Sequence, residues 1–296
     1  MRPLFRSLLV ILAFALTGPS ANAAEPFLYA GDSSSGTLHR IDKTTGSTQL
    51  STAVTINGNS AVWIKGLAAQ PGTGDLYAIV GEFATLDGVV DFKLATIAPD
   101  TGVATEIGLL SDRFSGLAWV VLPPTGDGTL QPIDALMGVT GNGASTPESL
   151  FIIDHTNAGS ALFMNLTMSG PGEAVAFNTL DGMLYRLSGS SIPDTPEGSL
   201  IDFEQIDLSG PSSTPIPLTG AQFSKGNGLV FDEATGGFFF AAETAPPPGD
   251  GGTGATELFS LNIGGTAAPV GAIAAYFGGM AFSFQVPVEL QSFSIE

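Results

Sequence analysis

The sequence contains no cysteine, only two histidines and only nine lysine and arginine residues. Without cysteine there can be no disulfide, no thiol nucleophile and no cysteine-ligated zinc site. His39 and His155 lie in different copies of the repeat described below, which argues against a histidine-based metal site and a Ser-His-Asp relay. No GxSxG, P-loop or strand-to-helix GxGxxG motif is present. The sequence therefore favours a binding protein over an enzyme.

The first two dozen residues have the pattern of an export signal. Arg2 and Arg6 precede an apolar run from Leu8 to Leu16, and small residues follow, ending in Ala-Asn-Ala at Ala23. This pattern predicts a Sec-type signal peptide over residues 1–24, because the apolar run is shorter than the roughly 20 residues of a membrane span. We therefore expect a periplasmic or extracellular protein with no membrane span.

Positive charge is scarce in the remaining chain. Seven lysine and arginine residues face 28 aspartates and glutamates, which gives a formal charge of −21 without the signal peptide. Such a surface repels nucleic acid and anionic lipid, so neither is an expected partner. With no disulfides, the mature fold must be held by its own core.

Glycine, proline and apolar residues are abundant instead. The chain has 39 Gly and 20 Pro, and 44% of its residues are hydrophobic, which predicts many short strands joined by turns. The segment from Lys225 to Ala242 shows the unit: an apolar strand, the turn DEATGG and a second apolar strand. Asp accepts hydrogen bonds from the following backbone and Gly takes positive φ, so this segment predicts a hairpin.

The same unit recurs along the chain. Apolar strands that open with a glycine motif start at five glycines 50, 56, 56 and 51 residues apart: Gly66, Gly116, Gly172, Gly228 and Gly279. Each of the first four is followed by three further strand-like segments. Four strands per unit at this period are typical of a β-propeller blade.

The two ends of the repeat region complete each other. The segment from Phe27 resembles the second strand of a unit, and the last copy stops after its first strand near Phe284. We therefore predict an all-β, five-bladed β-propeller over residues 25–284, with the C-terminal strand closing the N-terminal blade. Residues 285–296 form a tail or an extra edge strand. A β-sandwich is the alternative fold, although it would not explain the regular spacing.

The repeat register resembles that of bacterial secreted β-propellers with GLAfdp-x-TG-x-LYav and LyxID-x-x-TG repeats, a loose group that includes YVTN-type proteins. The resemblance covers residues 27 to 284, and the copy at Gly116 departs most from it. It implies an architecture and leaves the function open, because propellers serve as binders, enzymes and scaffolds.

The longer connections between second and third strands should gather on one face of the disc. They are expected at Gly81–Asp91, Gly141–Ser149, Ser188–Ser199 and Glu243–Thr256. Long loops on one face of a repeat protein often form its binding surface. We name this predicted surface the long-loop face.

Cations also cluster near the starts of the innermost strands on this face. Lys65, Arg113 and Lys225 lie one to three residues before their motif glycines, where they would surround the channel mouth and attract a small anion. The expected binding residues are Trp63, Lys65, Arg113, Glu173, Lys225, Asn227 and Tyr276. Alternatively, the cations pair with carboxylates on neighbouring loops, namely Glu173, Asp87, Asp91 or Asp194.

Three functions remain open at this point. The first is a monomeric binding module for a small anion or an unknown protein, with no cofactor. The second is a sugar-lactonase-like hydrolase, in which Glu173, Asn227 and Asp32 hold Ca²⁺ at the channel mouth. The third is a surface or matrix component with no small ligand.

Overall fold

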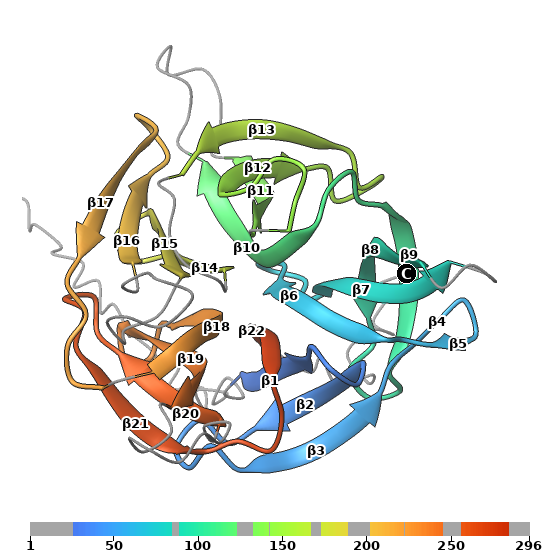
Figure 1. Cartoon of the computed structure of the whole chain (residues 1–296), viewed down its shortest axis with the longest axis horizontal. Helices are drawn as coiled ribbons and strands as arrows, with labels where there is room; N and C mark the ends of the chain where they lie inside the picture. Colours follow the sequence, from blue (N-terminus) through green and yellow to red (C-terminus); the bar gives the residue numbers. More distant parts are fainter. Residues whose placement is uncertain are drawn as a thin grey trace, which may run out of the picture.

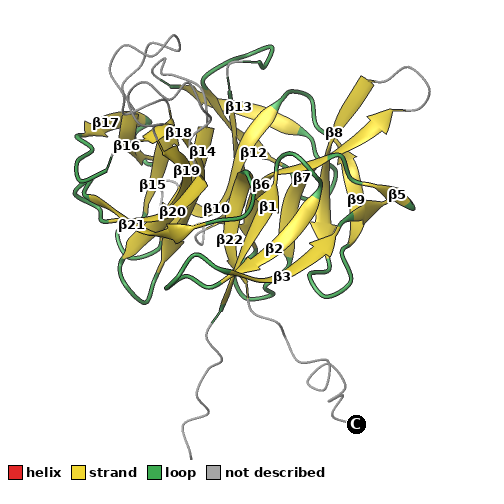
Figure 2. Ribbon diagram, turned by 60° about the horizontal axis from the view of Figure 1, so that its bottom comes forward, coloured by secondary structure: helices red, strands yellow, loops and turns green. Residues whose placement is uncertain are grey.

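The computed structural model describes residues 26–84, 89–122, 133–141, 143–166, 173–188, 202–221, 223–244 and 256–283. The predicted signal peptide and C-terminal tail both lie outside these residues. Every element that is described is a strand, and Figure 2 shows only strands and loops. The prediction of an all-β protein is confirmed.

Most strands belong to runs of four antiparallel neighbours. β6 (Trp63–Ala69), β7 (Leu76–Ala84), β8 (Val89–Ile97) and β9 (Val103–Leu109) pair in chain order. The same holds for β10 (Phe114–Leu122), β11 (Ile133–Thr140), β12 (Ser149–Ile153) and β13 (Ser160–Asn165). It also holds for β14 (Glu173–Asn178), β15 (Met183–Ser188), β16 (Asp202–Asp207) and β17 (Ser212–Ile216), and for β18 (Phe223–Asp232), β19 (Gly237–Thr244), β20 (Thr256–Leu261) and β21 (Ala267–Ala272).

The two ends of the described chain meet in one run. β22 (Phe277–Ser283) pairs antiparallel with β1 (Phe27–Asp32), which continues through β2 (Thr37–Ile41) to β3 (Thr48–Ala53). The register aligns Phe27 with Ser283. The strand near the C-terminus therefore completes the sheet that contains the N-terminal strands, as the repeat pattern predicts.

These sheets are arranged radially, as in a β-propeller. Figure 1 shows β6, β10, β14, β18 and β22 around the centre and β3, β9, β13, β17 and β21 at the rim. Separate hydrophobic clusters fill the spaces between consecutive sheets, and the last one packs β18 to β20 against β1 and β22. Both faces of the inner strands are therefore largely buried, whereas the rim strands carry exposed residues such as Leu50, Val103 and Leu162.

The repeated turns have the expected construction. In the β18–β19 turn, the Asp232 carbonyl accepts the Gly236 amide at 2.9 Å, and Gly236 has φ 67°. The turn from Asp42 to Gly46 repeats this arrangement, with a corresponding bond of 2.8 Å. Positive φ favours glycine at the end of the turn because it has no Cβ atom. The hairpin prediction for residues 225–242 is confirmed.

The motif glycines let the innermost strands approach closely. A Cβ atom on Gly279 would lie 2.6 Å from the Cα of Gly66, and one on Gly66 would lie 3.0 Å from the Leu117 amide nitrogen. A Cβ on Gly116 would lie 3.3 Å from the Cα of Ala174. We call this level of backbone contact the glycine waist.

Two features differ from the expectation. The segment predicted as a loop from Gly81 to Asp91 is largely strand, because β7 extends to Ala84 and β8 begins at Val89. A small hairpin, β4 (Thr55–Ile56) with β5 (Asn59–Ser60), lies against the edge of β9. Residues Asn57 and Gly58 take positive φ in its turn, which matches the preference of two-residue hairpins for Asn-Gly.

Candidate functional site

The first part of the predicted site lies at the start of β6. Trp63 and Lys65 are two residues apart, so both side chains lie on the same face of the strand. Trp63 is directly opposite Gly81 on β7, and a Cβ on that glycine would lie 2.2 Å from the indole ring. The missing side chain of Gly81 therefore leaves the space that the indole occupies.

Phe92 and Arg113 complete a cluster with these residues. The Trp63 and Phe92 ring centroids are 4.6 Å apart, and Lys65 Nζ lies 5.0 Å from the Trp63 centroid and 5.7 Å from that of Phe92. The Arg113 guanidinium carbon lies 5.8 Å from the Phe92 centroid. We call Trp63, Lys65, Phe92 and Arg113 the Lys65 cluster; its two cations flank an aromatic pair at distances typical of cation–π contacts.

Both cations lie in an unusual electrostatic environment. Burial lowers the pKa of Lys65, and the nearby positive charge of Arg113 lowers it further. In the described part of the chain neither residue forms an ion pair, whereas Lys43, Lys93 and Arg186 all do. Two like charges are thus held near each other with no carboxylate between them, an arrangement that a bound anion would stabilise.

The position of Arg113 is fixed through its neighbour Asp112. The Asp112 carboxylate accepts backbone amides from Arg113 at 2.8 Å, from Ser145 at 2.7 Å and from Thr146 at 2.9 Å. Burial acts to raise the pKa of Asp112, but these amides and the Arg113 charge lower it overall. The carboxylate thus ties the start of β10 to the loop before β12, and Arg113 itself remains exposed.

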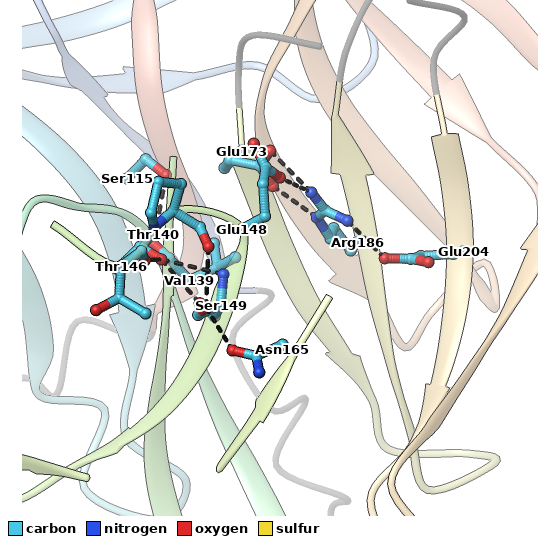
Figure 3. Close-up of polar contacts among 11 residues, drawn as sticks. Ser115, Val139, Thr140, Thr146, Glu148, Ser149, Asn165, Glu173, Arg186 and Glu204 are labelled. Atoms are coloured by element: carbon cyan, nitrogen blue, oxygen red, sulfur yellow. Dashed lines mark hydrogen bonds and ion pairs between the residues drawn. The ribbon is translucent and has the colours of Figure 1, made fainter. Parts of the chain in front are cut away.

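Glu173 is engaged elsewhere, in a buried cluster centred on Arg186 of β15 (Figure 3). Arg186 donates to Glu173 at 2.6 and 2.9 Å, to Glu204 at 2.8 Å and to Glu148. The guanidinium is 0% exposed and each carboxylate residue 3%. We call these four residues the Arg186 cluster. Glu173 is therefore unavailable at the channel mouth.

The charges in the Arg186 cluster do not balance, because three carboxyl groups surround one guanidinium. Burial and the neighbouring Glu148 hold the pKa of Glu173 well above its usual range, against the opposing effect of Arg186. A carboxyl group with such a raised pKa retains a proton at pH values where an exposed glutamate is ionised. Burial acts to lower the pKa of Arg186, but Glu173 and Glu204 raise it overall.

The remaining predicted residues lie on two other innermost strands. Lys225 and Asn227 are both on β18 and partly exposed, on either side of Gly226, which pairs with Ala242. Tyr276 precedes β22, and its carbonyl accepts both the amide and the hydroxyl of Ser33. Of the predicted set, Trp63, Lys65 and Arg113 come together in the Lys65 cluster.

The carboxylates of the alternative pairing do not form ion pairs with Lys65 or Arg113 in the described chain. Glu173 pairs with Arg186, and Asp91 forms no ion pair with described cations. Asp87 and Asp194 lie outside the described residues.

The acidic residues considered for calcium have other partners. Asp32 is 5% exposed and accepts Ser34 Oγ at 2.7 Å and Ser35 Oγ at 2.5 Å. Burial acts to raise the pKa of Asp32, but these hydrogen bonds lower it overall. Across residues 26–283, apart from the undescribed segments, no three acidic or histidine side chains are grouped to hold a metal ion.

His39 lies near an acidic residue and a serine. His39 lies 4.0 Å from Asp32 through Nε2 and 2.9 Å from Ser51 Oγ through Nδ1, and burial lowers its pKa. Ser51 is the cross-strand partner of His39 and is exposed on β3. This triplet resembles a relay in composition, but the Asp–His separation is too long for a hydrogen bond. We assign it no catalytic role.

Comparisons with known proteins show a likeness of fold. No protein-family model and no curated protein sequence matches the chain. The crystal structure of a protein of unknown function from Bacteroides caccae matches with a TM-score of 0.52 and 10% identity, covering 88% of this chain and 100% of that one. At this identity the match concerns the fold alone.

Two further solved structures match less well. A nidogen/laminin complex gives a TM-score of 0.49 and 12% identity, covering 87% of this chain and 98% of that one. TolB from Acinetobacter baumannii gives 0.44 and 14%, covering 82% and 52%. Within the described residues of the present chain, no helix is long and apolar enough to cross a membrane.

Proposed function

We propose that this protein is an exported, five-bladed β-propeller that binds a small anionic ligand at the Lys65 cluster on its long-loop face. The observation that carries the proposal is the placing of two cations near each other, neither of which forms an ion pair within the described chain. In a protein with only nine lysine and arginine residues, such a pair is costly unless an anion offsets the repulsion.

The blade count rests on the strand order. The runs β22-β1-β2-β3, β6 to β9, β10 to β13, β14 to β17 and β18 to β21 would each form one blade. A single parallel bridge, between Gly278 and Lys65, joins β22 to β6. We interpret this bridge as a contact between neighbouring blades at the waist.

The cluster suits a ligand that carries its charge on a flat group. Arg113 offers a planar guanidinium, which can donate two parallel hydrogen bonds to one carboxylate or phosphate. Lys65 offers a single ammonium that is partly desolvated between Trp63 and Phe92. Both cations would therefore contact one anion, and the aromatic rings would contact the apolar part of the same molecule.

A thermal-shift titration of the protein with phosphate, sulfate, acetate and citrate, each as its sodium salt, tests this proposal. A ligand that binds only the folded state at one hundred times its Kd stabilises it by about 2.7 kcal/mol. The wild type should show a shift with at least one anion, and Lys65→Met and Arg113→Met should each abolish it.

Arg40→Met is the matched control, because it removes one positive charge from β2, outside the Lys65 cluster. It should leave the shift unchanged. If all three variants lose the shift equally, the effect is one of overall charge and the proposed site is wrong. If no anion shifts the wild type, the anion proposal fails, and capture of a protein partner by the long-loop face becomes the experiment to make.

Export is proposed on the sequence pattern of residues 1–24. Expression of the full chain in a bacterial host, followed by N-terminal sequencing of the protein outside the inner membrane, tests it. A mature chain that starts near residue 24 supports export, whereas an intact Met1 in the cytoplasmic fraction contradicts it.

A further inference from the structure

A large cavity opens on the face opposite the Lys65 cluster. Its volume is about 750 Å³. It is lined by the second halves of β6, β10, β14, β18 and β22 and by the short turns that follow β6, β14 and β18. We call it the short-turn cavity. Because the predicted binding face was the other one, sequence reasoning gave this cavity no role.

Small side chains make the cavity possible. Where each innermost strand passes the glycine waist, a small residue occupies the equivalent position on the cavity wall: Ala68, Ala118, Ala176, Val230 and Ala281. Each is at most 8% exposed. Larger side chains at these positions would fill the centre. The close backbone contacts at the glycine waist narrow the centre on the side toward the Lys65 cluster.

The next residue of four of these strands is aromatic. Trp119, Phe177, Phe231 and Phe282 all line the cavity, and β6 contributes Ala69 instead. Phe177 and Phe282 are partly exposed, whereas Trp119 and Phe231 are 6% and 8% exposed and also pack in the hydrophobic clusters between sheets. We call these four residues the aromatic collar, and Ala69 is the gap in it. Aromatic walls with few polar groups are typical of sites for small apolar molecules, and the volume falls within the usual range of about 300–1,000 Å³.

The charged residues at the cavity are already paired with one another or with neighbours. Lys43 Nζ donates to Asp232 at 3.2 Å and lies 5.5 Å from the Phe282 ring centroid. Glu233 accepts the Thr179 hydroxyl at 2.6 Å. An anionic ligand would therefore have to displace Asp232 from Lys43 or remain without a counter-charge, which is unfavourable at a desolvated wall. A cationic ligand could pair with Glu233, but that residue is exposed and the attraction would be screened.

We propose that the short-turn cavity binds an uncharged, ring-containing apolar molecule. The size supports this class, because a cavity of about 150 Å³ suffices for benzene and this one is several times larger. Stacked or edge contacts with the collar would hold the rings, and displacement of loosely held water from apolar walls would favour binding. This site is independent of the anion site proposed above.

The experiment uses Nile red, a neutral fluorescent dye, with naphthalene as the competing neutral ring compound and naphthalene-2-sulfonate as its charged counterpart. The wild type should bind the dye with a blue-shifted emission, and naphthalene should displace it at a lower concentration than the sulfonate does. Equal displacement by both compounds overturns the proposed ligand class.

Two variants locate the site. Ala69→Phe would fill the gap in the collar, and we expect it to weaken dye binding about tenfold, equivalent to about 1.4 kcal/mol of lost contact. Ala161→Phe, at an exposed position of the rim strand β13, is the matched control and should bind as the wild type does. Lys65→Met should also leave dye binding unchanged. Equal affinity in the Ala69→Phe and Ala161→Phe variants overturns the proposal.

Tryptophan fluorescence gives a readout that does not depend on loss of folding. The chain has two tryptophans, of which Trp119 lines the cavity and Trp63 lies at the opposite end of the axis. Naphthalene should alter the emission of the Trp63→Phe variant and not that of Trp119→Phe. The reverse pattern places the ligand at the other face. Dye binding that increases when the chain is ended after Ser283 identifies the chain's own C-terminal segment as the occupant, and also overturns the proposal.

Discussion

Replacing Arg186 with methionine should destabilise the protein strongly, and more at neutral than at acid pH. The substitution leaves Glu148, Glu173 and Glu204 buried, each 3% exposed, without the guanidinium to which all three now bond. Removing one partner of a buried ion pair costs about 3–5 kcal/mol. We expect a loss of about 4 kcal/mol in the free energy of unfolding at pH 7.5.

The pH dependence follows from the carboxyl groups that remain. Burial holds the pKa of Glu173 well above its usual range even in the wild type, and the substitution removes the Arg186 charge that opposes this shift. The contribution of a carboxyl group with a raised pKa is present below its unfolded pKa and lost as the pH rises through its folded pKa. The loss caused by Arg186→Met should therefore shrink as the pH falls from 7.5 to 5.

Urea unfolding followed by tryptophan fluorescence at both pH values measures this difference. Adding Glu173→Gln to Arg186→Met should restore part of the stability at pH 7.5, because it removes one uncompensated buried carboxylate. Arg40→Met serves as the control and should cost no more than about 1 kcal/mol, which is the usual contribution of a cation–π contact such as that of Arg40 with the Phe27 ring. A loss below about 1 kcal/mol for Arg186→Met, or an equal loss at both pH values, would refute the reasoning.

Three further predictions concern the fold. Glu173→Gln should gain stability relative to the wild type as the pH rises from 5 to 8, because the stabilisation that the wild type obtains from Glu173, whose pKa is raised, is lost in that direction. Urea midpoints of both proteins at the two pH values measure this gain, and a constant difference between them contradicts it. Gly279→Ala should lower the free energy of unfolding by about 1–3 kcal/mol, because the new Cβ would lie 2.4 Å from the Leu67 amide nitrogen. Gly210→Ala should be nearly neutral in the same assay, because a Cβ there would have no atom within 4 Å. Lys93→Met should lower the melting temperature by removing bonds of 2.5 Å to Glu82 and 2.9 Å to Glu106, and an unchanged melting temperature would show that these bonds add nothing net.

The fold could be predicted from the sequence because its determinants are local and repeated. Each D-x-x-T-G turn fixes one hairpin, and alternation of short turns and apolar strands gives the order of strands within a sheet. The closing pair of β1 and β22 followed from the incomplete units at the two ends. The β7–β8 extension did not, because the apolar and acidic residues from Gly81 to Asp91 read equally well as a long loop.

The sequence predicted the Lys65 cluster only in part, namely those of its residues that lie at the starts of the innermost strands. Trp63, Lys65 and Arg113 meet because neighbouring innermost strands begin at the same end of the axis. Phe92 was missed because it directly follows the segment predicted as a loop, which ended at Asp91. Arg186 was also missed, and its signal was a single charged residue inside the apolar strand MLYRLS. Such a residue requires buried counter-charges. Glu204 is directly opposite Arg186 on β16, and Glu173 lies on the adjacent strand β14 of the same sheet. Glu148 comes from the loop before β12 in another sheet, and no local pattern records that contact.

The glycine waist explains how one central axis can hold two unlike environments. On one side, Lys65 and Arg113 lie with Trp63 and Phe92 in the Lys65 cluster. On the other side, the innermost strands continue with a small residue and then an aromatic one, which line an apolar cavity. Between them, backbone contacts such as that of Gly279 with Gly66 leave little room for a side chain. A ligand on one side would therefore contact none of the residues on the other. A substitution at the waist should disturb both sites together, whereas Lys65→Met and Ala69→Phe should each affect one.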